Sequence, residues 1–100
     1  MKYEIDFTQR AANHLRRYER YAQRIILEGI DEQLTHTPTV QTTNRKPLSK
    51  NEWSDWELRI GQYRVFYDVI HNDERHSVKV KAIGHKDHNV LYIGGQEVML

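Results

Sequence analysis

The stretch WSDWELRIGQYRVFYDV, residues 53–69, decides the fold because it is patterned as a β-hairpin. Apolar and polar residues alternate over residues 56–60 and again over residues 63–69, as in half-buried strands. The two residues between these runs, Gly61 and Gln62, supply the turn. One face of the hairpin is therefore apolar and is expected to lie on the core.

The polar face of this hairpin carries two arginines, Arg59 and Arg64, which a short loop places directly opposite each other. Like charges in that position destabilise a sheet by about 0.2–1 kcal/mol, so removing one of them should hardly lower stability. An anion bound between them would remove the conflict. Alternatively, a carboxylate on the same face, such as Glu57 or Asp68, neutralises them, or both side chains extend into water. The pattern leaves these alternatives open.

The composition is that of a soluble globular protein with one domain, residues 1–100. Hydrophobic residues make up 38% and charged residues 29%, and no apolar run approaches the about 20 residues of a membrane span. The first residues alternate instead of forming a hydrophobic secretion signal, so we expect a cytoplasmic protein without a membrane partner. The formal net charge is +1, so any affinity for nucleic acid must come from local patches.

Cysteine and histidine usage limits the possible chemistry. The chain has no cysteine, which excludes disulfides and thiolate chemistry. Its six histidines show no ligand spacing that argues for a metal. We therefore expect no metal site and no cofactor.

The N-terminal part predicts a strand followed by helices. Residues 2–7 alternate in strand fashion, and Thr8 is a suitable N-cap for a helix that begins at Gln9. Apolar residues at helical spacing continue to about His36, but in two different registers. A break at residues 18–20 therefore gives two helices in a hairpin.

The remaining segments are shorter. Residues 37–51 are polar, contain both prolines and are expected to form a loop. After the central hairpin, residues 71–75 form a turn and residues 77–84 a further strand. A short helix is expected over residues 87–92, ended by the glycine pair 94–95.

Positive charge is concentrated in the helical region, where five arginines face a single acid, Glu19. The arginines are Arg10, Arg16, Arg17, Arg20 and Arg24. They form either a solvated helix face or a surface that binds a phosphate backbone through release of counterions.

Two segments carry a family resemblance. LRIGQYRVFYDV at residues 58–69 and AIGHKDHNVLY at residues 82–92, in this order of elements, resemble the RelE/ParE toxin superfamily of bacterial toxin–antitoxin systems. The resemblance covers nearly the whole chain. It implies an α+β fold with a compact antiparallel sheet of about four strands, the N-terminal helical hairpin on one face and a basic concave surface on the other.

The resemblance also implies an activity. RelE-like members enter the ribosomal A site and cut messenger RNA without a metal, as the ribose 2′-hydroxyl attacks the adjacent phosphate. This chemistry needs a base for the 2′-proton, cations for the phosphorane charge and an acid for the leaving 5′-oxygen. The implied partners are a cognate antitoxin, the ribosome with its messenger RNA, and operator DNA only through the antitoxin complex.

Several residues match positions that carry this chemistry in RelE-like toxins. Arg59 matches a basic catalytic residue, and Arg64 matches the phosphate-binding arginine. Lys86 matches a basic residue after the glycine of the last strand, and Tyr92 the tyrosine that orients the target base. Glu57 replaces a lysine of the RelE type. It is either a general base or a neutralising partner of Arg59 in a protein that has lost cleavage.

Two histidines flank Lys86 in the sequence. Imidazole groups exchange protons near neutral pH, so either His85 or His88 could do so, although both could equally be surface residues. We count His85 among the catalytic candidates and His88 among those that contact RNA. The full set of expected RNA-binding residues is Arg16, Arg17, Arg20, Phe66, Lys79, Lys81 and His88.

The leading hypothesis is thus a toxin that acts as a ribosome-dependent messenger-RNA endoribonuclease and is held inactive by an antitoxin. Within the same superfamily, the alternatives are a ParE-type inhibitor of DNA gyrase and a relative that has lost toxicity. The pair of arginines, the GHK segment at residues 84–86 and the C-terminal tyrosine suit RNA cleavage better than a gyrase contact.

Overall fold

The central hairpin forms as the sequence predicts. Strands β3 (Trp56–Ile60) and β4 (Tyr63–His71) pair antiparallel. Arg59 lies opposite Arg64, which confirms the predicted register. Gly61 in the turn has a φ of 58°, a left-handed conformation that glycine adopts without steric cost.

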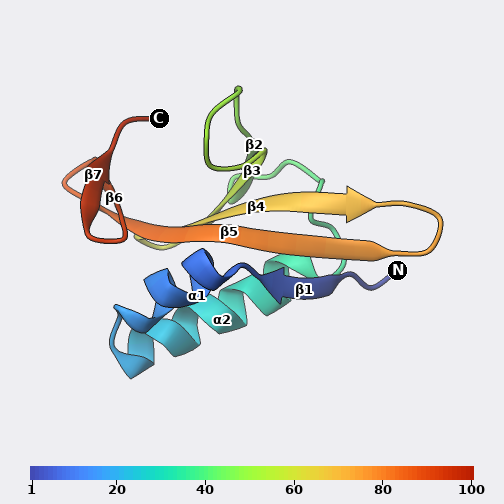
Figure 1. The fold of residues 1–100 in the computed structure, drawn as a ribbon, viewed down its shortest axis with the longest axis horizontal. Coiled ribbons are helices and arrows are strands. Elements are labelled where there is room, and N and C mark those ends of the chain that lie inside the picture. Colours follow the sequence, from blue (N-terminus) through green and yellow to red (C-terminus); the bar gives the residue numbers. More distant parts are fainter.

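The structure, a computed structural model, describes all residues 1–100 and has an α+β fold. The other elements are β1 (Glu4–Phe7), α1 (Gln9–Arg16), α2 (Arg20–Leu34), β2 (Arg45–Pro47), β5 (His76–Asp87), β6 (Val90–Ile93) and β7 (Gln96–Val98). The strands form one seven-stranded sheet in the order β2-β3-β4-β5-β6-β7, with β1 paired in parallel to β5. Both helices lie on one side of the long β4–β5 ribbon, and β2 and the β6–β7 hairpin rise on the other (Figure 1).

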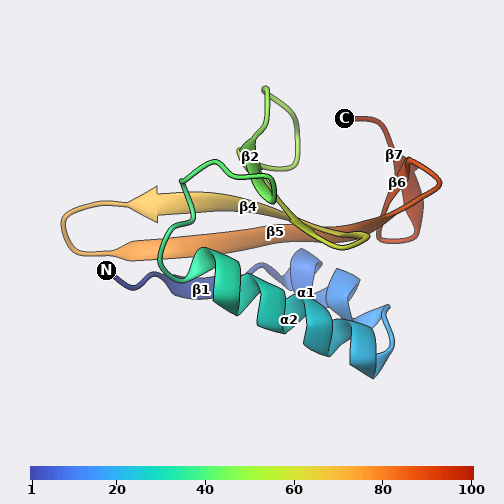
Figure 2. The ribbon, with the colours of Figure 1, turned by 180° about the vertical axis from the view of Figure 1, so that it is seen from behind.

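The predicted helical hairpin is confirmed. Thr8 caps α1, since its Oγ1 accepts from the backbone N–H of Ala11 at 3.0 Å. The chain leaves helical hydrogen bonding between Arg16 and Arg20, where the apolar register changes. Figure 2 shows α1 and α2 side by side beneath the sheet. Neither helix has the length and apolar character needed to cross a membrane.

The main core lies between these helices and the sheet. Ile26 and Ile30 of α2 and Val65 of β4 are almost completely buried there. The whole cluster is Tyr3, Ala11, Ala22, Ile26, Ile30, Leu34, Leu58, Tyr63, Val65, Tyr67, Val78, Val80 and Ile83. Burial of this apolar surface is the main force that holds the helices on the sheet.

The edge of β5 is shared between two strands, and α1 covers the gap between them. β1 pairs with the first part of β5 and β6 with the last part, which leaves residues 81–83 without a strand on that edge. The Thr8 hydroxyl lies 3.4 Å from the carbonyl oxygen of Lys81. The backbone N–H of Ile83 donates to Nδ1 of His14 at 3.2 Å. Side chains at the start of the chain therefore satisfy backbone groups that a strand would otherwise pair.

Three predictions about the sheet are wrong. The short C-terminal helix over residues 87–92 does not form, because His88 and Asn89 both have positive φ and make a tight turn from β5 into β6. The expected loop of residues 37–51 contains β2. With β2, β6 and β7 added to the four expected strands, the sheet has seven strands instead of about four.

Candidate functional site

The face of the sheet opposite the helices has a small core of its own. The resemblance implied an open basic surface here, but the centre of this face is apolar. It is formed by Trp53, Phe66, Ala82, Leu91 and Ile93, with Leu48 and Val98 packed at the margin. Phe66 has no exposed surface, so its ring is not available to stack on a base.

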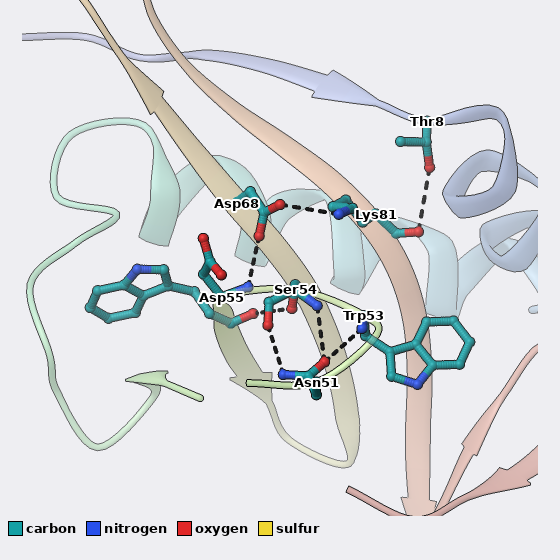
Figure 3. Close-up of polar contacts among 8 residues, drawn as sticks. Thr8, Asn51, Trp53, Ser54, Asp55, Asp68 and Lys81 are labelled. Carbon is teal, nitrogen blue, oxygen red and sulfur yellow. Dashed lines mark hydrogen bonds and ion pairs between the residues drawn. The ribbon is translucent and has the colours of Figure 1, made fainter. Parts of the chain in front are cut away.

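Polar contacts hold the loop that carries Trp53 onto this second core (Figure 3). The side-chain oxygen of Asn51 accepts from the backbone N–H of Trp53 at 2.6 Å. The carboxylate of Asp68 accepts from the backbone N–H of Asp55 at 2.7 Å and from Nζ of Lys81 at 3.1 Å. Lys81, expected to contact RNA, is therefore engaged in an ion pair within the sheet.

Beside the second core lies a buried carboxylate surrounded by cations, which we call the Glu57 site. Glu57 of β3 is 7% exposed, and its Oε1 lies 3.6 Å from Nζ of Lys46, directly opposite it on β2. Arg59 and Arg64 share this face of the hairpin. Lys86 of β5 lines the same cavity as Glu57. A carboxylate so placed can accept a proton while the cations hold an anion beside it.

The two arginines of the hairpin behave differently. Arg59 is exposed to solvent, whereas Arg64 is 7% exposed and its Nη1 donates to the carbonyl oxygens of Gly61 at 2.8 Å and Tyr63 at 3.0 Å. Burial lowers the pKa of Arg64, the Glu57 carboxylate opposes that change and the charge of Arg59 adds to it. The turn carbonyls, the neighbouring Glu57 carboxylate and solvent thus relieve the expected like-charge conflict between Arg59 and Arg64.

A cavity of about 560 Å³ opens at the Glu57 site, between the segment after β2 and the β6–β7 hairpin. This volume lies within the about 300–1,000 Å³ typical of ligand sites. Three lysines line it together with Glu57, namely Lys46, Lys50 and Lys86. Sequence reasoning missed Lys46 and Lys50, because the polar segment that contains them shows no strand alternation.

His85 and Tyr92 lie on the opposite face of the sheet from the Glu57 site. Adjacent residues of a strand point to opposite faces, so His85 pairs across the sheet with Tyr63 while Lys86 faces the cavity. The ring of His85 stacks on Tyr92, with centroids 5.5 Å apart, and its Nδ1 lies 2.8 Å from the hydroxyl of Tyr18. Burial raises the pKa of Tyr18 to about 12, which keeps this hydroxyl protonated. We call Tyr18, Tyr63, His85 and Tyr92 the aromatic cluster.

The other residues expected to contact RNA are dispersed. Arg16, Arg17 and Arg20 are exposed on the helical layer, across the sheet from the Glu57 site. Lys79 is exposed on β5, and His88 lies in the turn after that strand. The structure therefore gathers Glu57, Arg59, Arg64 and Lys86 and leaves these five apart.

Comparisons with known proteins agree with this fold. A family model described as the ParE toxin of the type II toxin–antitoxin system, parDE, matches residues 5–90. None of the curated protein sequences gives a significant match. A chain from the crystal structure of the toxin–antitoxin complex RelBE2 of Mycobacterium tuberculosis is similar, with a TM-score of 0.69 and 23% identity over 86% of this chain and 100% of that chain. The match to RelBE2 shows a shared fold, and the family model covers most of the sequence. The chain therefore belongs to the ParE toxin family of type II toxin–antitoxin systems, within the RelE/ParE superfamily.

Proposed function

We propose that this toxin is a messenger-RNA endoribonuclease that works on the ribosome and that the Glu57 site carries the chemistry. The observation that supports this most directly is the placement of Glu57, a buried carboxylate beside Arg64 and Lys46 at the end of a cavity. Burial of a charge is costly unless it is compensated; here Lys46 and Arg64 compensate the carboxylate, and the cavity gives it access to a substrate.

In the proposed reaction Glu57 removes the proton from a ribose 2′-hydroxyl. The 2′-oxygen then attacks the adjacent phosphorus, the bond from phosphorus to the 5′-oxygen breaks, and a 2′,3′-cyclic phosphate forms. Arg59 and Arg64 cannot act as bases, so they stabilise the charge on the phosphorane oxygens. Lys86, on the same cavity, returns a proton to the leaving 5′-oxygen.

Few groups of the toxin contact the substrate in this mechanism. Part of the rate enhancement must therefore come from the ribosome, which holds the messenger RNA in position. Purified toxin should therefore leave free RNA nearly intact. Rapid cutting of ribosome-free RNA would contradict this part of the proposal.

A second candidate function is inhibition of DNA gyrase. Two observations favour it: the matching family model is named for the ParE toxin, and Nη1 of Arg64 is already engaged by turn carbonyls. In that case the Glu57 site would have only a structural role.

An experiment with matched variants separates the two functions. Wild-type toxin and Glu57→Gln are added to an in vitro translation reaction and to a gyrase supercoiling assay, with Glu28→Gln, an exposed glutamate of α2, as the control. We expect the wild type and Glu28→Gln to stop translation and Glu57→Gln to be at least about a hundredfold less active. Inhibition of supercoiling with translation unaffected would establish the alternative.

We also propose that the antitoxin of this system covers α2. Tyr21 is 64% exposed and Ile25 is 43% exposed, and Arg20 and Arg24 lie beside them. An amphipathic segment rich in acids would bury the apolar stripe and pair with the arginines. Co-expression with the product of the neighbouring reading frame should restore growth, and Tyr21→Glu should abolish the rescue. Rescue that is unchanged in Tyr21→Glu would place the antitoxin elsewhere.

A further inference from the structure

A second cavity, of about 620 Å³, lies on the other side of β7 from the Glu57 site. One wall is α1 with its C-cap residue, and it contributes Arg10, Asn13, His14 and Arg17. The other walls are the loop with Trp53 and the β6–β7 hairpin. The mechanism proposed for the Glu57 site does not use this cavity.

His14 presents a hydrogen-bond donor to the cavity. The ring is 8% exposed, and its Nδ1 accepts from the backbone N–H of Ile83 at 3.2 Å. A neutral ring with Nδ1 as acceptor carries its proton on Nε2. Burial lowers the pKa of His14, and the charges of Arg10 and Arg17 lower it further, so the ring is neutral near pH 7. Nε2 forms no hydrogen bond within the protein and is accessible to solvent, so it is free to donate to a bound group.

Two arginines flank this donor without a carboxylate partner. Arg10 lies over the ring of Trp53, with its Cζ 4.3 Å from the centroid, and Arg17 lies against Gly95. Glu52 and Glu97 also line the cavity, but neither forms an ion pair with these arginines. The cavity therefore holds two guanidinium groups and one neutral imidazole N–H as free donors, together with the carboxylates of Glu52 and Glu97.

The β6–β7 turn is shaped to leave these side chains in place. Gly94 and Gly95 both have positive φ, at 61° and 82°. A Cβ on Gly94 would lie 3.2 Å from Nε2 of His14, and a Cβ on Gly95 would overlap the guanidinium of Arg17. The absence of side chains on the turn thus allows His14 and Arg17 to reach the cavity.

We propose that this cavity binds a phosphate group, which accepts from Nε2 of His14 and from the guanidinium groups of Arg10 and Arg17. A phosphate has only acceptors on its ionised oxygens, and guanidinium groups bind it through paired N–H donors. Its source is either free phosphate or the backbone of an RNA strand. Glu97, Val98 and Met99 line both cavities, so a strand bound at the Glu57 site could continue across β7 into this one. Only this RNA version rests on the proposed function.

The first test uses inorganic phosphate and the intact chain. Sodium phosphate is titrated at constant ionic strength while NMR follows the side-chain N–H signals of Arg10, Arg17 and His14. We expect saturable shifts of these signals and a dissociation constant raised about tenfold or more in Arg10→Gln and Arg17→Gln. Arg75→Gln, which removes an exposed arginine outside the cavity, should bind like the wild type. Shifts that do not saturate, or equal weakening by all three substitutions, would overturn the proposal.

A second arm identifies the source of the phosphate with a 2′-O-methyl oligoribonucleotide, which lacks the attacking hydroxyl. If Arg17→Gln binds the oligonucleotide about tenfold more weakly than the wild type, the site is assigned to the RNA backbone. If Arg17→Gln binds the oligonucleotide as the wild type does but no longer binds inorganic phosphate, the site is assigned to free phosphate. Saturation by an acidic peptide with no response to phosphate would overturn the proposal. None of these readouts requires cleavage, so a toxin that binds phosphate but cuts no messenger RNA refutes the proposed function alone.

Discussion

Replacing Arg64 by methionine should destabilise the protein, although the sequence alone suggested little effect. Met keeps an apolar stem of similar volume but lacks the two hydrogen bonds to the carbonyl oxygens of Gly61 and Tyr63. Hydrogen bonds from a charged donor contribute about 1.5–3 kcal/mol. Because a single nitrogen makes both bonds, we expect Arg64→Met to lower the free energy of unfolding by about 2–3 kcal/mol. In a domain of this size each kcal/mol shifts the melting temperature by about 4–8 °C, so the melting temperature should fall by about 8–24 °C.

The assay is thermal and urea unfolding at pH 7, followed by circular dichroism. Arg59→Met is the control, because Arg59 is exposed, and its effect should stay within about 0.5 kcal/mol. In a Glu57→Gln background the effect of Arg64→Met should be smaller, since no buried carboxylate is left without its neighbouring charge. If Arg64→Met melts within about 2 °C of the wild type, the bonds to the turn carbonyls do not stabilise the hairpin and the reasoning fails.

Three further predictions concern stability. Tyr67→Phe should cost about 1–2 kcal/mol in urea unfolding, since the buried Tyr67 hydroxyl donates to the carbonyl oxygen of Pro38 at 2.7 Å, and a change below about 0.3 kcal/mol would contradict this. Folding lowers the pKa of His14, so the unfolded chain binds more protons below pH 6.5. The free energy of unfolding should therefore rise with pH as the pH approaches 6.5 from below, and His14→Gln should flatten that rise in a pH series. Gly84→Ala should separate β6 from β5, because the new Cβ would overlap the carbonyl of Tyr92. Amide hydrogen exchange in β6 that stays as slow as in the wild type would refute this prediction.

The central hairpin could be predicted because its strands alternate with period two around a glycine turn, and this pattern fixes both pairing and register. The C-terminal hairpin could not. Its turn depends on positive φ at His88 and Asn89, where the sequence has no glycine to mark it, and on the free edge of β5. The three residues of β2 are too few to show any period. Both β2 and the C-terminal hairpin therefore form because they pair with neighbouring strands, and not because of a local sequence pattern.

Strand alternation also predicted part of the candidate site. Alternation in the hairpin placed Glu57 and Arg64 on one face. Applied to β5, it would also have separated His85 from Lys86, which the sequence analysis had grouped because they are neighbours in the chain. The role of His14 could not be foreseen, because it depends on the gap between two strands along the edge of β5.

The central claim is that the Glu57 site cleaves messenger RNA on the ribosome. The most direct test is to map the 3′ ends of messenger RNA in an in vitro translation reaction containing wild-type toxin or Glu57→Gln. We expect the wild type to produce new ends within codons that carry 2′,3′-cyclic phosphate, and Glu57→Gln, with its fold intact by circular dichroism, to produce almost none. Intact messenger RNA with wild-type toxin, or equal cutting by the variant, would contradict the claim.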